Sequence, residues 1–251
     1  MAKQNSLIKI EGALDGLSFK QTKDGYTVKK LRPVSKSVME TSDKFKRTRE
    51  NWNEFRNGAG ASRILRAALK DALSHGKDSR IVSRLTQQMI KVAKSDPDNN
   101  RGERVVANGD ISMLKDFNFN IGAVLNQCLK LELIPVFERT TGKVTLNIPT
   151  FDVDDTIQSP SGATHFRIHV TACEINFETG ESVVKYSESD PFATQSAEVA
   201  AFTIPHQLTA QSTNPLFCVA GICFYDMVNG KLYPLRNGGF NALGIIGVNR
   251  P

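Results

Sequence analysis

The segment LFCVAGICFYDMVNGKLYPL, residues 216–235, says most about the fold. Its first part, Leu216–Val228, is apolar at both even-numbered and odd-numbered positions, which is typical of a central strand that is covered on both faces. Asn229-Gly230 follows, and an Asn-Gly pair between apolar runs is a strong signal for a two-residue hairpin turn. We therefore expect a long central strand that turns back into a hairpin partner.

Strand-like runs bounded by turn residues recur through the second half of the chain. They are Leu131–Glu138, Lys143–Pro149, His165–Phe177, Glu181–Tyr186, Glu198–Ile204, Leu216–Val228, Lys231–Leu235 and Ala242–Val248. Many short strands at this spacing indicate an antiparallel β-sandwich.

The first 31 residues predict a small β-meander. Its strands are Ser6–Glu11, Leu17–Thr22 and Tyr26–Leu31, with turns at Asp15-Gly16 and Asp24-Gly25, since Asp-Gly pairs suit two-residue hairpin turns. A structure this small is marginal in water, so we expect it to pack on the helices or on another chain.

Helical patterns follow the meander. Ser42-Asp43 is a plausible helix start, and residues 44–72 show helical spacing. The small residues 57–61 either break this helix or allow a close backbone crossing. A second amphipathic helix is predicted over residues 79–94, with Asp78 as its cap.

The sequence thus predicts an α+β protein: a small N-terminal β-meander, two to three amphipathic helices, then an antiparallel β-sandwich. The polar stretch 95–110 suggests a boundary between a basic domain, 1–110, and a sandwich domain, 111–251. The first holds 23 Lys+Arg against 13 Asp+Glu, a net charge of +10, and the second 9 against 13, a net charge of −4; together they give the chain's +6. This asymmetry suggests an anionic partner, or an acidic face of a neighbouring copy, for the basic half.

A basic stripe is the clearest candidate site. In a continuous helix, Arg49, Arg56, Arg63 and Lys70 recur every seven residues and share one slowly drifting face. Such a stripe suits the phosphates of nucleic acid or an acidic protein surface. Alternatively, it is a solvated face, or it pairs with acidic residues of its own helix. The tentative binding residues are Lys46, Arg49, Arg56, Arg63, Arg66 and Lys70. The acidic residues that could pair with them are Glu50, Glu54 and Asp71. The aromatic residues of this segment, which we expect in the core and not stacked on bases, are Phe45, Trp52 and Phe55.

Other polar groups carry weaker signals. His165, Arg167 and His169 share one face of a strand, and we expect an exposed polar face there instead of a metal site. Asp152, Asp154 and Asp155 lack the glycine and glutamate of a calcium-binding loop, so a polar turn is expected. The sequence has no phosphate-binding loop, dinucleotide fingerprint or nucleophile elbow. We expect no catalytic residue, no metal and no cofactor.

The four cysteines, Cys128, Cys173, Cys218 and Cys223, stand among apolar residues and form no Cys-x-x-Cys pair. They are interpreted as buried thiols in a reducing compartment. No run of about 18 apolar residues occurs, so a membrane span is not expected. A cytoplasmic location, or one within a phage-like particle, follows as the expectation.

The N-terminal quarter resembles a family of uncharacterised proteins of the Bacteroidota. The resemblance lies in Ile10–Gly12, Leu14–Phe19, Lys23–Tyr26, Phe45–Asn51 and Glu54-Phe55. It implies a short β-meander, a basic helix and a strand-rich second half, together with a bacterial or phage-related cytoplasmic origin. It implies no reaction, ligand or catalytic residue.

Three functions remain open from the sequence. The first is a non-enzymatic structural protein that forms homo-oligomers or filaments, or joins the other subunits of a phage-like or similar particle. The alternative is a nucleic-acid-binding protein that uses the basic stripe. The third is an enzyme whose site is assembled from residues far apart in the chain.

Overall fold

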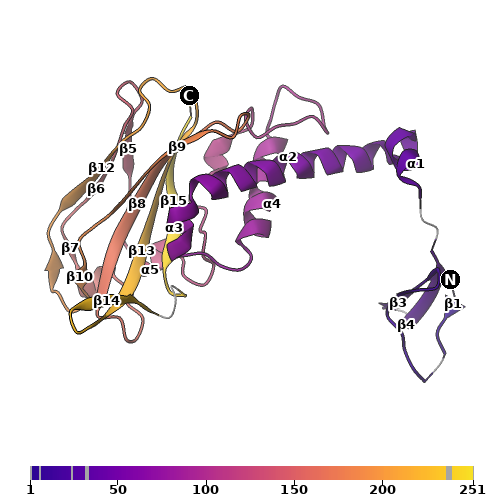
Figure 1. The fold of residues 1–251 in the computed structure, drawn as a ribbon, viewed down its shortest axis with the longest axis horizontal. Helices are drawn as coiled ribbons and strands as arrows, with labels where there is room; N and C mark the ends of the chain where they lie inside the picture. The colour runs from indigo at the N-terminus through magenta and orange to yellow at the C-terminus, as the bar shows by residue number, and fades with distance from the viewer. Residues whose placement is uncertain (1, 6, 24, 32–33, 236–238, 251) are drawn as a thin grey trace. The chain divides into compact units, whose positions relative to one another are not determined.

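A computed structural model describes residues 2–5, 7–23, 25–31, 34–235 and 239–250 (Figure 1). The chain forms two compact units, residues 1–49 and 50–251. Strands open the first unit, while the second combines helices with antiparallel sheets. The predicted α+β class is therefore confirmed.

The first unit contains a four-stranded antiparallel sheet in the order β1-β4-β3-β2. Its strands are β1 Ala2–Lys3, β2 Gly12–Leu14, β3 Leu17–Thr22 and β4 Gly25–Lys30. The turn at Asp15-Gly16 is confirmed, with φ values of 46° and 74°. Asp24 of the second predicted turn lies outside the described residues.

The strand predicted at Ser6–Glu11 is wrong for the part that is described, residues 7–11. The Gln4 side chain accepts a hydrogen bond from the Ile10 backbone N–H at 3.2 Å and donates one to the Ile10 carbonyl at 3.3 Å. These bonds tie Gln4 to Ile10. Beyond the sheet, the unit adds helix α1 Lys36–Thr41 and the 3₁₀ turn η1 Asp43–Phe45.

Three helices follow: α2 Lys46–Ala68, α3 Lys70–His75 and α4 Ile81–Lys94. Helix α2 continues through Gly58-Ala59-Gly60, so the predicted interruption is not a break. The alternative of a close crossing holds for Gly58, because a Cβ there would lie 2.6 Å from Ile90 Cγ1. The Asp78 side chain accepts from Arg80 N at 2.7 Å, just before the start of α4.

The second unit is built on a six-stranded antiparallel sheet. Its strands are β8 His165–Ile175, β9 Ser182–Glu188, β10 Phe192–Ala193, β13 Leu216–Val228, β14 Lys231–Pro234 and β15 Ala242–Asn249. Strand β13 pairs with β8 on one side and with β15 and β14 on the other, which confirms the predicted central strand. Asn229 and Gly230 have φ values of 51° and 77° and form the predicted hairpin turn.

A second layer of short strands and turns packs on this sheet. It contains a three-stranded sheet, β12-β6-β5, and the pair β11-β7, so the predicted strand 198–204 is divided between two pairings. The elements of this layer are α5 Leu125–Cys128, β5 Pro135–Glu138, β6 Lys143–Ile148, β7 Phe151–Asp152, α6 Val153–Thr156, β11 Glu198–Val199 and β12 Phe202–Gln207. The 3₁₀ turn η2 Ile111–Leu114 packs with the helices on the other face of the sheet.

Two apolar cores lie on the two faces of the central sheet. Even-numbered residues of β13, such as Cys218 and Ile222, pack toward the second layer of strands. Odd-numbered residues, such as Phe217 and Val219, pack against the helices together with Leu65 of α2. This arrangement explains why the segment is apolar at both parities.

The shared core also explains why the chain divides at residues 49 and 50 and not near residue 110. Helices α2–α4 bury their apolar side chains against the central sheet, so they belong to the same compact unit. The polar stretch 95–110 is itself organised around Asp96, which is 4% exposed. Its carboxylate accepts hydrogen bonds from the backbone N–H groups of Asp98, Asn99 and Val105.

Candidate functional site

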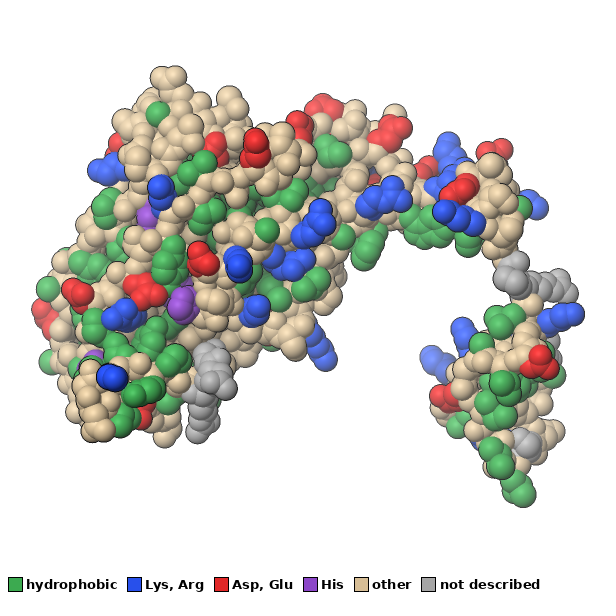
Figure 2. All heavy atoms as spheres, viewed as in Figure 1, with side chains coloured by type: hydrophobic (Ala, Val, Ile, Leu, Met, Phe, Trp, Pro, Cys, Tyr) green, Lys and Arg blue, Asp and Glu red, His purple; other side chains and the backbone are tan. Residues whose placement is uncertain are grey.

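Helix α2 and the start of α3 carry a row of cations in the second unit. Arg56, Arg63 and Lys70 are exposed, and Arg66 is half-buried beside them. Within the described residues, none of these four side chains makes an ion pair or a hydrogen bond. Lys and Arg side chains recur along α2 on the face shown in Figure 2. We call Arg56, Arg63, Arg66 and Lys70 the cationic face.

The acidic residues of α2 point away from this face. Glu50 Oε2 lies 3.4 Å from Arg101 Nε, and Glu54 Oε1 lies 3.8 Å from Arg104 Nη1. Glu54 is 5% exposed and also accepts from the Gly102 backbone N–H. Both carboxylates lie next to cations of the 101–104 loop, and neither pairs with a residue of the cationic face.

The remaining residues of the predicted stripe belong to the first unit. Arg49 Nη1 donates to the Met39 carbonyl at 2.9 Å and to the Ser42 carbonyl at 2.8 Å. Arg49 thus holds the turn between α1 and α2, a structural role that the seven-residue spacing does not reveal. Lys46 is exposed at the start of α2.

Two aromatic residues predicted to be core lie on the surface of α2. Trp52 is 46% exposed and Phe55 is 60% exposed, whereas Phe45 is half-buried. The buried face of α2 instead carries small residues, because it crosses α4 closely at Gly58. An apolar groove of about 620 Å³ runs between α2 and α4 and is lined by Phe55, Ala59, Ser79, Arg80, Val82, Ser83, Thr86, Gln87 and Ile90.

A polar cluster lies where α3 ends on the central sheet. His169 was expected on an exposed strand face, but it is 1% exposed, because the end of α3 covers it. Its ring centroid lies 5.7 Å from that of His75 and 5.8 Å from that of Tyr186. Glu188 accepts from Tyr186 Oη at 2.5 Å and from Arg167 Nη1 at 2.7 Å. His165 and Arg167 stay partly exposed at the rim.

Glu188, Tyr186 and Arg167 are linked by hydrogen bonds, whereas neither ring nitrogen of His169 has a hydrogen-bond partner among the described residues. Burial lowers the pKa of His169 to about 3, with a contribution from nearby His75, so the ring is neutral. Burial raises the pKa of Glu188, but the hydrogen bonds from Tyr186 and Arg167 outweigh it and lower that pKa overall. Burial and the bond to Glu188 raise the pKa of Tyr186. The geometry therefore fits a polar clamp between α3 and the sheet.

The cysteines are similarly inert. Cys173, Cys218 and Cys223 are buried free thiols, and Cys128 is half-buried, as the sequence predicts for most of them. Burial raises the pKa of Cys218 and Cys223 to about 12, which leaves almost no reactive thiolate at neutral pH.

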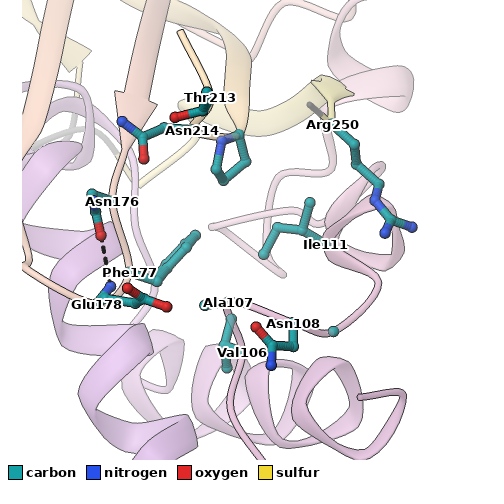
Figure 3. A pocket seen from close by; sticks show the side chains of 12 residues that line it. Val106, Ala107, Asn108, Ile111, Asn176, Phe177, Glu178, Thr213, Asn214 and Arg250 are labelled. Carbon is teal, nitrogen blue, oxygen red and sulfur yellow. Dashed lines mark hydrogen bonds between the residues drawn. The ribbon is translucent and has the colours of Figure 1, made fainter. Parts of the chain in front are cut away.

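A hollow of about 440 Å³ opens near the end of the chain (Figure 3). Phe177, Val106 and Ile111 provide apolar walls, and Arg250 stands at the rim, 3.0 Å from Asp110. Asn176 accepts from the Glu178 backbone N–H, so its side chain supports the local turn. The lining combines these apolar walls with the polar side chains of Asn108, Thr213 and Asn214.

An acidic edge lies on the second layer of strands. Strand β7 pairs with β11 so that Asp152 faces Glu198 directly. Asp152 also accepts from the Asp155 backbone N–H at 3.1 Å and caps α6, which confirms that the aspartates form a turn. All four carboxylates, Asp152, Asp154, Asp155 and Glu198, are exposed and make no ion pair with any described residue.

The first unit presents an amphipathic sheet. Cross-strand pairing places Leu14, Leu17, Phe19, Tyr26 and Val28 on one face, together with Gln21 and with Lys30, which lies opposite Leu17. Lys20 and Lys29 lie on the other. Leu14 is 60% exposed and Leu17 is 37% exposed, and the only residue of the unit with a buried side chain, among those described, is Thr27. The described part of this unit therefore lacks an apolar core of its own.

In the part of the chain that the structure describes, no three His, Cys, Asp or Glu side chains are grouped closely enough to hold a metal ion. None of the described helices combines the length and apolar character that crossing a membrane requires. Comparisons with protein-family models, curated proteins and solved structures find no match. Functional inference therefore starts from the surfaces above.

Proposed function

We propose that this protein is a non-enzymatic structural subunit that assembles with further copies of itself or with other subunits of a larger particle. The observation that carries the proposal is the largely apolar face of the N-terminal sheet, which no described part of the first unit covers and on which Leu14 and Leu17 are exposed. A unit of 49 residues with no apolar core of its own gains most of its stability from the surface against which it packs.

The edges of this sheet support the same proposal. Its outer strands, β1 and β2, each have one edge that pairs with no described strand and leaves backbone hydrogen-bonding groups available to another chain. Addition of a strand at such an edge, combined with burial of the apolar face, is an established way to join protein subunits.

Light scattering coupled to size-exclusion chromatography tests the proposal over about a hundredfold range of concentration. The wild-type chain is expected to form oligomers that grow with concentration. The variant Leu14→Asp/Leu17→Asp places two charges on the apolar face and is expected to weaken assembly. Its matched control, Ala13→Asp/Ser18→Asp, places the same charges on the opposite face of the same strands.

A strictly monomeric wild-type protein at every concentration, including in mixtures with extract from its source cells, would contradict the proposal. Equal assembly of both variants would show that the apolar face of the N-terminal sheet is not part of the contact between subunits. Circular dichroism checks that the second unit is folded in each variant.

Nucleic-acid binding is the second candidate, and the exposure of Trp52 and Phe55 next to Arg56 favours it. Aromatic side chains among unpaired cations can stack on bases while the cations contact phosphates. Fluorescence anisotropy with single-stranded and duplex oligonucleotides should then show affinity that falls steeply as salt rises. Absence of binding at low salt would eliminate this candidate.

A further inference from the structure

We propose that the cationic face of α2 binds the acidic edge of a second copy of this chain, in a head-to-tail contact. The inference rests on the assembly function above and names one of its contacts. It uses two surfaces of the second unit only: Arg56, Arg63, Arg66 and Lys70 on one side, and Asp152, Asp154, Asp155 and Glu198 on the other.

The two surfaces belong to opposite layers of the unit. Helix α2 packs on the helical face of the central sheet, where Leu65 contacts the core. Phe151, Val153 and Val199, which neighbour the acidic residues, pack into the core on the other face of the sheet. Figure 1 shows α2 and β7 on opposite sides of the second unit. One copy therefore cannot bring its own surfaces together, whereas a second copy can.

Each surface carries uncompensated charge in the isolated subunit. Asp152 and Glu198 are directly opposed across two strands, an arrangement of like charges that destabilises a strand pair. On α2, Arg56 and Arg63 are seven residues, or about 10 Å, apart along the helix axis, with no acidic side chain between them that reaches either one. Contact between copies would relieve the repulsion on both surfaces at once.

The apolar surroundings favour a protein partner over nucleic acid. The groove beside the cationic face is lined by Val82, which is 49% exposed, and by Ile90. These aliphatic side chains can pack against a protein surface but make no favourable contact with phosphates. The acidic edge has small exposed apolar neighbours, Ala197, Ala200 and Ala201, which can enter a shallow groove. Exposed Trp and Arg side chains also match the composition of protein-interface hot spots.

The symmetry of the contact has a direct consequence. Because the two surfaces differ, the contact is heterologous and leaves a free cationic face at one end and a free acidic edge at the other. Repetition generates a ring if the rotation between copies closes, and an open filament if it does not.

The test uses a charge swap in the full-length chain. Variant A, Arg56→Glu/Arg63→Glu/Lys70→Glu, reverses the charge of the cationic face. Variant B, Asp154→Lys/Asp155→Lys/Glu198→Lys, reverses the charge of the acidic edge. Each variant alone should need at least about a tenfold higher concentration to assemble, because its two surfaces then repel. An equimolar mixture should assemble again, since each contact once more joins opposite charges and the two variants alternate.

The control is Lys77→Glu/Lys91→Glu/Lys94→Glu, which changes the net charge as variant A does but alters exposed residues before and on α4, outside the cationic face. In sedimentation velocity the control should assemble like the wild type. Every protein or mixture that assembles should do so more weakly at high salt, because salt screens the charges. Restored assembly in the A and B mixture, with copies alternating by native mass spectrometry, supports the inference.

Three results would overturn it. If wild type and both charge variants assemble equally while Leu14→Asp/Leu17→Asp does not, the assembly function stands and this contact is wrong. If variant A assembles normally but loses binding to an oligonucleotide, the cationic face is a nucleic-acid surface. If the wild type is a strict monomer, both the assembly function and this contact fail.

Discussion

Protonation of His169 should destabilise the folded protein in mild acid, by an amount that follows from its burial. The ring is 1% exposed, and neither of its nitrogens has a hydrogen-bond partner among the described residues. Its pKa is lowered to about 3, against about 6.5 in an unfolded chain. Below pH 6.5 the unfolded state therefore binds a proton that the folded state excludes. The contribution of the neutral ring to stability is fully present above pH 6.5 and is lost progressively as the pH falls toward 3.

The difference between the folded and unfolded pKa of His169 sets how much stability is lost at pH 5. At pH 5 the unfolded imidazole is almost fully protonated and the folded one is almost fully neutral, so the loss is about 2 kcal/mol relative to pH 7.5. Urea unfolding, followed by circular dichroism at both pH values, measures it. The variant His169→Phe keeps an aromatic ring between His75 and Tyr186 but cannot be protonated, so its free energy of unfolding should change by about 2 kcal/mol less between the two pH values.

Two comparisons make the result specific. His165→Phe removes a partly exposed imidazole from the rim of the same strand and should leave the wild-type pH dependence almost unchanged. His169→Asn provides a second non-titrating side chain if the larger phenyl ring does not fit against Gly221, where a Cβ would lie 2.3 Å from His169 Nε2. Identical pH dependence in the wild type and in both His169 variants would refute the reasoning, since it would show that water or a proton acceptor reaches the ring.

Three further outcomes are expected in simple measurements. Gly58→Val should destabilise the protein by about 1–3 kcal/mol in urea unfolding, because its side chain would collide with Ile90, whereas Gly60→Ala, with open space at its Cβ, should stabilise it by up to about 1 kcal/mol. Glu54→Ala should cost about 1–3 kcal/mol, by loss of the Gly102 bond and the Arg104 pair, and limited proteolysis should then cut the 101–104 loop faster than in the wild type. Trp52, the single tryptophan, should be quenched readily by iodide at low protein concentration and become protected when copies assemble; equal quenching in both states would place it outside the contact.

The sequence was sufficient to predict strands and turns where the spacing of apolar side chains follows directly from burial. Leu216–Val228 is apolar at both parities because two cores meet on its two faces, and no other arrangement of a strand requires that pattern. The turns at Asp15-Gly16 and Asn229-Gly230 were equally predictable, since positive φ at both positions selects these residue types.

Burial of particular polar and aromatic residues was not predictable from spacing alone. His169 alternates with apolar residues as an exposed strand residue would, and only the packing of α3 onto that part of the sheet covers it. A signal was present on the partner strand, where Gly221 faces His169 and makes room for the ring. Trp52 and Phe55 have core-like spacing, yet small residues such as Gly58 and Ala61 occupy the buried face of α2.

The division of the chain decides how the cationic face can act. Had the helices formed a separate domain that ended near residue 110, their charges would move relative to the sandwich. Instead Leu65 and Phe217 share one core, so the cationic face and the acidic edge belong to one rigid unit. Binding between two such surfaces would cost translational and rotational freedom and the freedom of a few side chains, but no ordering of one domain against another. If the proposed contact forms, every copy repeats it with the same geometry, and a regular polymer is then expected instead of a disordered aggregate.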